Sequence, residues 1–154
     1  MKYFKADISR VDELVKMRIA YMLDDYDSIS EEKIEGMKEQ LPGYFEEHLG
    51  KDLIAFVAEE EGNVVATALL LIVNKPANPK FIKGRVGEVL NVYTKTEFRR
   101  RGIARKLMEQ LIACGREKEL DLIELSATGE GYGLYKKIGF EEKKNEYTEM
   151  VYVL

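Results

Sequence analysis

The segment that most restricts the possible folds is a strand-like run that turns directly into an amphipathic helix. We expect the strand over residues 86–94 and the helix over 101–118, with an arginine-rich turn between them. A second buried strand is expected at 120–125. A helix that joins two parallel strands of one sheet crosses over in a right-handed sense. This part of the chain therefore predicts a sheet covered by helices.

The remaining segments extend this sheet. Apolar runs at 53–59 and 64–73 flank Glu60-Glu61-Gly62-Asn63, which predicts an antiparallel hairpin with Gly62 and Asn63 available for positive φ. Further strands are expected at 2–5 and 146–154, and further helices at 7–23, at 30–41 with a resumption over 44–49, and at 130–138. The element order is then β-α-α-β-β-β-α-β-α-β. It predicts one α/β (α+β) domain over 1–154, with a mixed, mostly antiparallel sheet of six to seven strands and helices on both faces.

Composition excludes several classes of protein. The longest apolar run, 64–73, is shorter than the roughly 18 residues that a membrane-spanning helix needs. The first residues contain no apolar core of a signal peptide. The lone Cys114 falls in a helical pattern and fits a reducing compartment, and the lone His48 cannot build a histidine metal site. We therefore expect a cytoplasmic protein without a metal or a membrane segment.

Charge is distributed unevenly along the chain. The net charge is −4, which argues against a nucleic-acid partner. One stretch nevertheless has five cations and no acid: Arg99, Arg100, Arg101, Arg105 and Lys106. A concentrated basic site on an acidic protein indicates a small anionic ligand.

The basic turn has the residues that anion capture requires. The first N–H groups of a helix have no intrahelical acceptor and carry the positive end of its dipole. Gly102 and Ala104 leave space for a phosphate to approach them. A pyrophosphate fits such a turn, although a basic helix start with small residues for close packing is the alternative. The three glycines of a dinucleotide fingerprint and the Gly-Lys-Ser/Thr of a P-loop are missing.

Two motifs carry a resemblance to a known family. Arg99 to Ala104 reads Arg-x-x-Gly-x-Ala and resembles the acyl-CoA-binding signature of the GNAT N-acetyltransferase superfamily. Leu134 to Phe140 is similar to that family's Leu-Tyr-x-x-x-Gly-Phe, and the expected element order matches along essentially the whole chain. The resemblance implies an acyltransferase that moves an acetyl group from acetyl-CoA to a primary amine of a small molecule or protein, by direct attack on the thioester.

The resemblance also implies a cofactor site. The pantetheine arm would lie along the strand at 86–94 and bond to the backbone of Val92 and Thr94. Arg99 would flank the site. Thr128 stands where many members have an asparagine that contacts the cofactor, and its hydroxyl could either substitute for that group or cap the following helix. The diphosphate would rest on the amides of Arg100, Arg101, Gly102, Ile103, Ala104 and Arg105.

Two residues are implied as catalytic. Tyr135 would be the general acid, although its ring could simply pack in the core beside Phe140. Glu88 would be the general base, because it precedes Arg99 by the same eleven residues as the strand glutamate of some protein-acetylating members. A solvated strand glutamate is the alternative there. Asn91 either forms the bulge that splays this strand or is a polar surface residue.

The sequence does not identify the acceptor amine. Its pocket would be built from the first two helices, where several side chains could line it or form scaffold: Met17, Arg18, Tyr21, Met22, Tyr44 and Phe45. A catalytically silent CoA-binding regulatory module and a nucleic-acid binder are alternatives from other classes. A homodimer is possible, as is common in the family.

Overall fold

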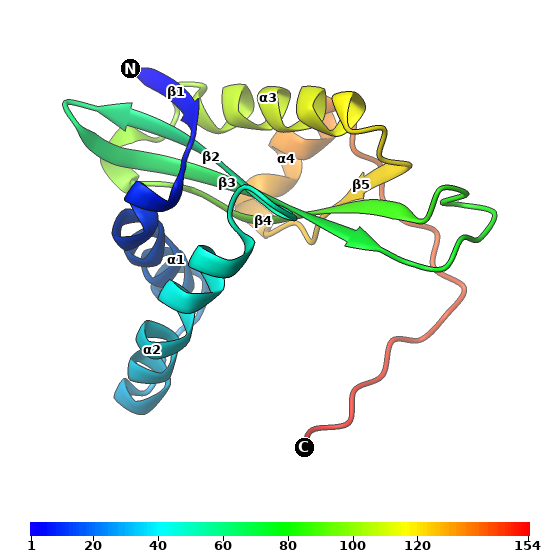
Figure 1. Cartoon of the computed structure of the whole chain (residues 1–154), viewed down its shortest axis with the longest axis horizontal. Helices are drawn as coiled ribbons and strands as arrows, with labels where there is room; N and C mark the ends of the chain where they lie inside the picture. The colour runs from blue at the N-terminus through cyan, green and yellow to red at the C-terminus, as the bar shows by residue number, and fades with distance from the viewer.

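The computed structural model describes all residues 1–154, which form one central sheet with helices on both of its faces (Figure 1). The strands are β1 (Lys2–Lys5), β2 (Leu53–Glu60), β3 (Asn63–Asn74), β4 (Arg85–Thr94) and β5 (Leu122–Glu124). The helices are α1 (Val11–Asp25), α2 (Glu31–His48), α3 (Ile103–Glu117) and α4 (Gly129–Ile138), with short 3₁₀ turns at Ile8–Arg10 and Thr96–Phe98. None of these helices combines the length and the apolar content needed to cross a membrane.

The sheet has the strand order β1-β2-β3-β4-β5. The pairs β1–β2, β2–β3 and β3–β4 are antiparallel, and the pair β4–β5 is parallel. This confirms the expected mixed, mostly antiparallel sheet. The parallel pair is the one joined through α3, as the sequence predicts for a strand–helix–strand unit.

Two hydrophobic cores lie on opposite faces of the sheet. Leu14 of α1 and Phe45 of α2 belong to one core, while Leu107 and Leu111 of α3 belong to the other. Figure 1 shows α1 and α2 below the sheet and α3 with α4 above it. β2 and β3 serve both cores because alternate side chains of a strand point to opposite faces. These two strands are accordingly buried almost throughout.

The hairpin between β2 and β3 forms where it is expected. Its turn places Glu61 at φ 49° and Gly62 at φ 79°, whereas Asn63 is already the first residue of β3. Two successive left-handed residues are what a two-residue hairpin turn requires. The glutamate, rather than the asparagine, therefore takes the second positive φ.

The expected strand at 146–154 is wrong for this structure, and the sheet has five strands rather than six to seven. Residues 141–154 form neither helix nor strand. Alternating side chains specify a half-buried strand but do not specify which sheet edge it pairs with. β5 is also shorter than expected at its start, because the Leu120 amide bonds to the Gly115 carbonyl at the end of α3.

Helix α2 continues through Pro42, where an interruption was expected. An internal proline removes one hydrogen bond and crowds the preceding turn. Leu41 and Phe45 lie on either side of it and are both buried in the core beneath the sheet. Burial of both side chains requires the helix to continue, and this packing offsets the lost backbone bond.

Candidate active site

The site is organised around the point where β4 and β5 separate. The two strands pair only from Val86 to Glu88 of β4, opposite Leu122 to Glu124 of β5. Beyond Glu88, β4 continues for six residues without that neighbour. Val92 and Thr94, the expected pantetheine contacts, lie on this unpaired stretch and are partly exposed. The structure thus contains the opening between two strands that a thioester would need.

A bulge in β4 creates this separation. Asn91 has φ 51°, and the β3–β4 register shifts between Thr67 and Leu69. A bulge bends its strand and increases the local twist. Of the two possibilities for Asn91, bulge or surface residue, the structure shows the bulge, with the side chain only 4% exposed.

Thr67 of β3 holds the bulge in place. Its hydroxyl donates to the Asn91 carbonyl at 3.0 Å and accepts from Asn91 Nδ2 at 2.9 Å. The bulge shifts the Asn91 carbonyl out of register with the backbone donors of β3. The Thr67 hydroxyl therefore takes the place of a backbone donor. Asn91 Oδ1 is buried without a partner. Thr67 was not expected to have this role, since a threonine in a strand carries no distinguishing signal.

Replacement of Thr67 with valine tests this arrangement. Valine has the same shape but leaves two buried polar groups of Asn91 without partners, each costing about 1–3 kcal/mol. We expect the free energy of unfolding in urea to fall by about 2 kcal/mol or more. Thr67→Ser, which keeps the hydroxyl, is the matched control and should lose less. Equal losses for both variants would contradict a role for the hydroxyl.

The turn before α3 has the backbone geometry of an anion site. Arg100 has φ 61° and Gly102 has φ 74°, while Arg101 and Ile103 have negative φ. Alternation of this kind turns successive N–H groups toward one concavity. None of the six amides from Arg100 to Arg105 donates a hydrogen bond, and the first bond of the helix is from the Lys106 amide to the Gly102 carbonyl.

Side chains leave this concavity open. A Cβ built on Gly102 would meet no protein atom within 4 Å. Ile103 points into the core above the sheet and is only 3% exposed, which fixes the start of α3. Ala104 contributes no more than a methyl group. The structure therefore has a helix N-terminus with six amides that are not used within the protein.

The arginines of the turn have different surroundings. Arg99 lies away from the concavity: its Nε donates to the Thr94 carbonyl at 2.9 Å, and its Nη2 pairs with Asp24 of α1 at 2.9 Å. Arg101 donates to the Glu97 carbonyl and lies over the Phe98 ring, and Arg105 pairs with Glu109. Only Arg100 has no partner.

Arg99 joins three elements across the end of β4. Besides Asp24 it approaches Glu130 of α4 at 3.8 Å, and its guanidinium lies 5.7 Å from the Tyr93 ring centroid. Asp24 raises the pKa of Arg99 through a hydrogen bond. The same pair neutralises a carboxylate in the last turn of α1, where the helix dipole disfavours an acid. From its place in the basic stretch Arg99 was expected at the anion site, and its link to α1 was not expected.

Tyr135 lies on α4 with its ring in the core above the sheet. Thr128 caps this helix by accepting from the Gly131 amide at 3.2 Å, the alternative role weighed for it from sequence. A Cβ on Gly131 would come within 2.7 Å of the Tyr135 ring, so glycine is needed there for the ring to pack. Phe140 contacts the ring edge-on at 5.9 Å between centroids.

The hydroxyl of Tyr135 has a raised pKa. Burial raises its pKa to about 12, and the phenol of Tyr21 on α1 adds to the shift. Tyr135 belongs to the upper core, whereas Tyr21 lies on a helix below the sheet. Ring packing and an available hydroxyl thus coexist at this position.

Glu88 occupies the last residue of β4 that is paired with β5. It is half-buried and lies opposite Leu71 of β3 and Glu124 of β5. Its charge acts on Tyr44 of α2, whose pKa is raised first by burial, then by Asp52, and further by Glu88. The carboxylate therefore faces the side of the sheet on which α1 and α2 lie.

The expected acceptor residues separate into scaffold and surface. Met17 and Phe45 are buried in the lower core and serve as scaffold. Tyr21 contacts Tyr93 of β4 edge-on, with centroids 6.1 Å apart, so it lies at the opening itself. Arg18 and Tyr44 are partly exposed near it.

Comparison with known proteins agrees with this architecture. The family model described as acetyltransferase (GNAT) domain matches residues 51–142. A structure of a predicted acetyltransferase with acetyl-CoA from Clostridium acetobutylicum is similar with a TM-score of 0.86 and 28% identity, over 97% of this chain and 95% of the other. A GCN5-related N-acetyltransferase from Ralstonia eutropha gives a TM-score of 0.83 at 21% identity, over 97% of each chain.

One curated relative is similar in sequence as well. It is glucosamine 6-phosphate N-acetyltransferase 1 of Oryza sativa subsp. japonica, 32% identical over 99 residues. The match spans 62% of this chain and 57% of the relative, so part of each protein lies outside it. Fold and family model together define the class, an acyltransferase domain. The chain belongs to the GNAT acetyltransferase family.

Proposed function

We propose that the protein transfers the acetyl group of acetyl-CoA to a primary amine of a small molecule or a protein. The observation that carries this proposal is the run of six unused amides, Arg100 to Arg105, beside the opening between β4 and β5. An anion held there places its attached arm along the unpaired stretch of β4. The similar Clostridium structure with acetyl-CoA supports the choice of donor.

The residues present fit CoA as a ligand. Six backbone donors at the positive end of α3 suit a diphosphate, and Gly102 adds no side chain to block it. Val92 and Thr94 lie on the part of β4 that lacks its β5 neighbour, where backbone groups can bond the pantetheine amides; the Thr94 carbonyl already accepts from Arg99 Nε. Bound acetyl-CoA supplies a thioester carbonyl that the acceptor amine attacks.

Tyr135 is proposed as the proton donor to the departing sulfur. With a pKa of about 12 it stays protonated throughout the physiological range, against about 8.5 for a free thiol. Complete proton transfer to a thiolate in its ground state is therefore unfavourable. The hydroxyl acts chiefly by a hydrogen bond that strengthens as charge develops on sulfur.

Glu88 is proposed as the group that accepts the proton of the incoming ammonium. An alkyl amine with a pKa near about 10 arrives protonated and cannot attack in that form. Glu88 is half-buried at the point where the strands begin to separate, and it faces α1 and α2, between which an acceptor would enter. Its position relative to the opening supports this role over that of a solvated strand residue.

The pH dependence of Glu88→Gln tests the assignment. We expect kcat/KM to fall by about 10²–10⁴ at pH 7, the usual contribution of a general base. The loss should shrink steadily as the pH approaches about 10, because the amine then arrives unprotonated. Glu124→Gln, on the neighbouring strand in the same register, is the control and should be nearly inert. A defect of Glu88→Gln that is constant with pH would contradict the role of base.

An acceptor screen tests the proposed function as a whole. Thiol release from acetyl-CoA is measured with sugar amines that include glucosamine 6-phosphate, and with amino acids, polyamines, aminoglycosides and peptides. We expect release that depends on at least one amine, with N-acetylated product identified by mass spectrometry. Tight binding of CoA without transfer to any amine would instead favour a silent CoA-binding module.

A further inference from the structure

We propose that Arg18 binds an acid group of the acceptor, so that the preferred substrate is a small amine with a carboxylate or a phosphate on the same molecule. The proposal rests on the proposed acetyl transfer and narrows its acceptor. Three features carry it: the face of α1 on which Arg18 lies, its lack of an acidic partner, and the separation of its charge from that of Glu88.

Arg18 lies on the face of α1 that is turned to the sheet. This helix contacts β3 and β4, and Val11 and Leu14 belong to its buried stripe. Residues three or four positions apart share one face of a helix, so Arg18 continues the stripe one turn beyond Leu14. Tyr21, three residues further, contacts Tyr93 of β4 edge-on. The stripe therefore changes from apolar to polar where α1 reaches the opening beside β4.

The guanidinium of Arg18 has no partner within the chain. It is partly buried, yet it forms no hydrogen bond and no ion pair. The arginines at the two ends of α1 are paired instead: Arg10 with Glu13, and Arg99 with Asp24. A charge that is partly removed from water without a partner costs free energy, and an anionic ligand would offset this cost.

Glu88 supplies the opposite charge on the same side of the sheet. It lies opposite Leu71 in the β3–β4 register and two residues before Leu90, so these three side chains share one face. Leu71 and Leu90 pack against the core beneath the sheet, as does Tyr44 of α2. The carboxylate of Glu88 is therefore turned toward α1 and α2.

Arg18 and Glu88 act on the same aromatic side chain but do not pair with each other. The pKa of Tyr44 is raised first by burial and then by Asp52, while Arg18 lowers it and Glu88 raises it. No ion pair joins the two groups. Opposite charges held apart on one surface attract a molecule with the reverse arrangement. An amine that carries an acid group has this arrangement, with its ammonium near Glu88 and its anion near Arg18.

Neighbouring acids leave Arg18 available to a ligand. Asp52 lies 2.8 Å from Nδ1 of His48, within hydrogen-bond distance, and Asp25 is exposed two helical turns beyond Arg18. A guanidinium presents a planar fork of donors that matches the oxygens of a carboxylate or a phosphate. The same cation repels an acceptor with a second ammonium, such as a polyamine. Arg18 therefore selects for one class of amine and against another.

Matched pairs of acceptors test the proposal by kinetics. Glucosamine 6-phosphate is compared with glucosamine for the phosphate, and an amino acid with its amide for the carboxylate. Arg18→Gln should lower kcat/KM about 10–100-fold for the acidic member of one pair, because charge-assisted hydrogen bonds are lost. The neutral member should change less than about twofold, and Arg18→Lys should restore part of the activity with the acidic member. Each ratio compares a variant with the wild type on one acceptor, so differences in amine pKa cancel.

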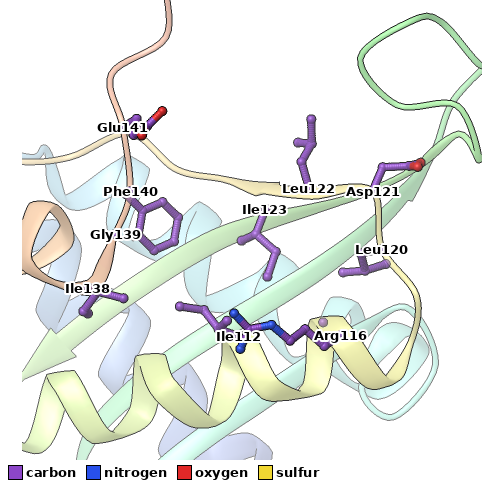
Figure 2. Close-up of a pocket in the computed structure, with 11 residues that line it drawn as sticks. Ile112, Arg116, Leu120, Asp121, Leu122, Ile123, Ile138, Gly139, Phe140 and Glu141 are labelled. Atoms are coloured by element: carbon purple, nitrogen blue, oxygen red, sulfur yellow. The ribbon is translucent and has the colours of Figure 1, made fainter.

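Arg116 provides the matched control. Figure 2 shows it in the second half of α3 close to Ile112, and α3 covers the other face of the sheet. Arg116 is exposed and forms no ion pair, so Arg116→Gln makes the same change of net charge away from the acceptor. This variant should keep the wild-type preference. Equal losses on both members of each pair in Arg18→Gln, or a loss of preference in Arg116→Gln as well, would overturn the proposal.

Arginine side-chain resonances separate this inference from the proposed function. ¹⁵N-labelled protein with bound CoA is titrated with both members of each pair, and the Arg18 Nε signal is assigned by its absence from Arg18→Lys. We expect an acidic member to shift this signal saturably and its neutral counterpart to leave it in place. If the shift occurs but no amine is acetylated, the proposed function fails and the acid-binding role of Arg18 stands. An Arg18 signal that neither acidic compound shifts would overturn that role even if amines are acetylated.

Discussion

Replacement of Gly102 with valine is expected to abolish measurable binding of acetyl-CoA while the protein stays folded. Gly102 lies at φ 74° in the middle of the six unused amides, and its Cβ position is empty of protein atoms. A branched side chain there occupies the space of the anion. It removes at least two charge-assisted hydrogen bonds, each worth about 1.5–3 kcal/mol. Affinity by calorimetry should fall roughly a hundredfold or more, since about 1.4 kcal/mol is tenfold.

The same substitution also strains the backbone, and this effect needs its own control. A non-glycine residue at positive φ costs about 1–3 kcal/mol. Gly62 lies at φ 79° in the β2–β3 turn, equally free of neighbours and remote from the site. Gly62→Val should lower the melting temperature as much as Gly102→Val yet bind acetyl-CoA normally. Similar affinities for the two variants would refute the anion site.

Replacement of Tyr135 with phenylalanine is expected to lower kcat by about 10²–10⁴ with little change in the affinity for acetyl-CoA. Phenylalanine keeps the ring that Phe140 and Gly131 pack against, so the core is preserved. Only the hydroxyl is lost, the group that we propose donates to the departing sulfur. Single-turnover rates and calorimetry on the same preparation separate the two effects.

Tyr132 provides the matched control for this variant. It lies on the same helix, and its side chain is exposed. Tyr132→Phe should retain full kcat, whereas full kcat in Tyr135→Phe would remove the role of proton donor. Because the pKa of Tyr135 is about 12, its ionisation should not reduce the wild-type rate until the pH exceeds about 10.

Local rules predicted the segments whose partners are close in sequence. The β2–β3 turn, the cap at Thr128 and the glycine-containing start of α3 each depend on a few adjacent residues. The turn and the helix start form where they are expected, although Glu61 rather than Asn63 takes a positive φ, and the cap was one of two alternatives for Thr128. The bulge at Asn91 was one of two sequence alternatives. What decides it is Thr67, 24 residues away, whose hydroxyl replaces the lost ladder donor.

The features that sequence did not predict depend on distant partners. Arg99 reads as part of a basic cluster, but Asp24 lies 75 residues earlier and draws it to α1. The sequence alone does not show why residue 131 is glycine, because the reason is the space that the Tyr135 ring occupies. The alternating residues 146–154 read as a strand, yet a strand needs an edge to pair with, and no pattern within the segment specifies one.

Amide chemical shifts measure the central claim most directly. ¹⁵N-labelled protein is titrated with CoA and, separately, with pantetheine, which has no diphosphate. The account predicts large shifts for the amides of residues 100–105 with CoA and small shifts there with pantetheine, while the β4 amides near Val92 respond to both. Saturable CoA binding that leaves the amides of residues 100–105 unmoved would contradict it.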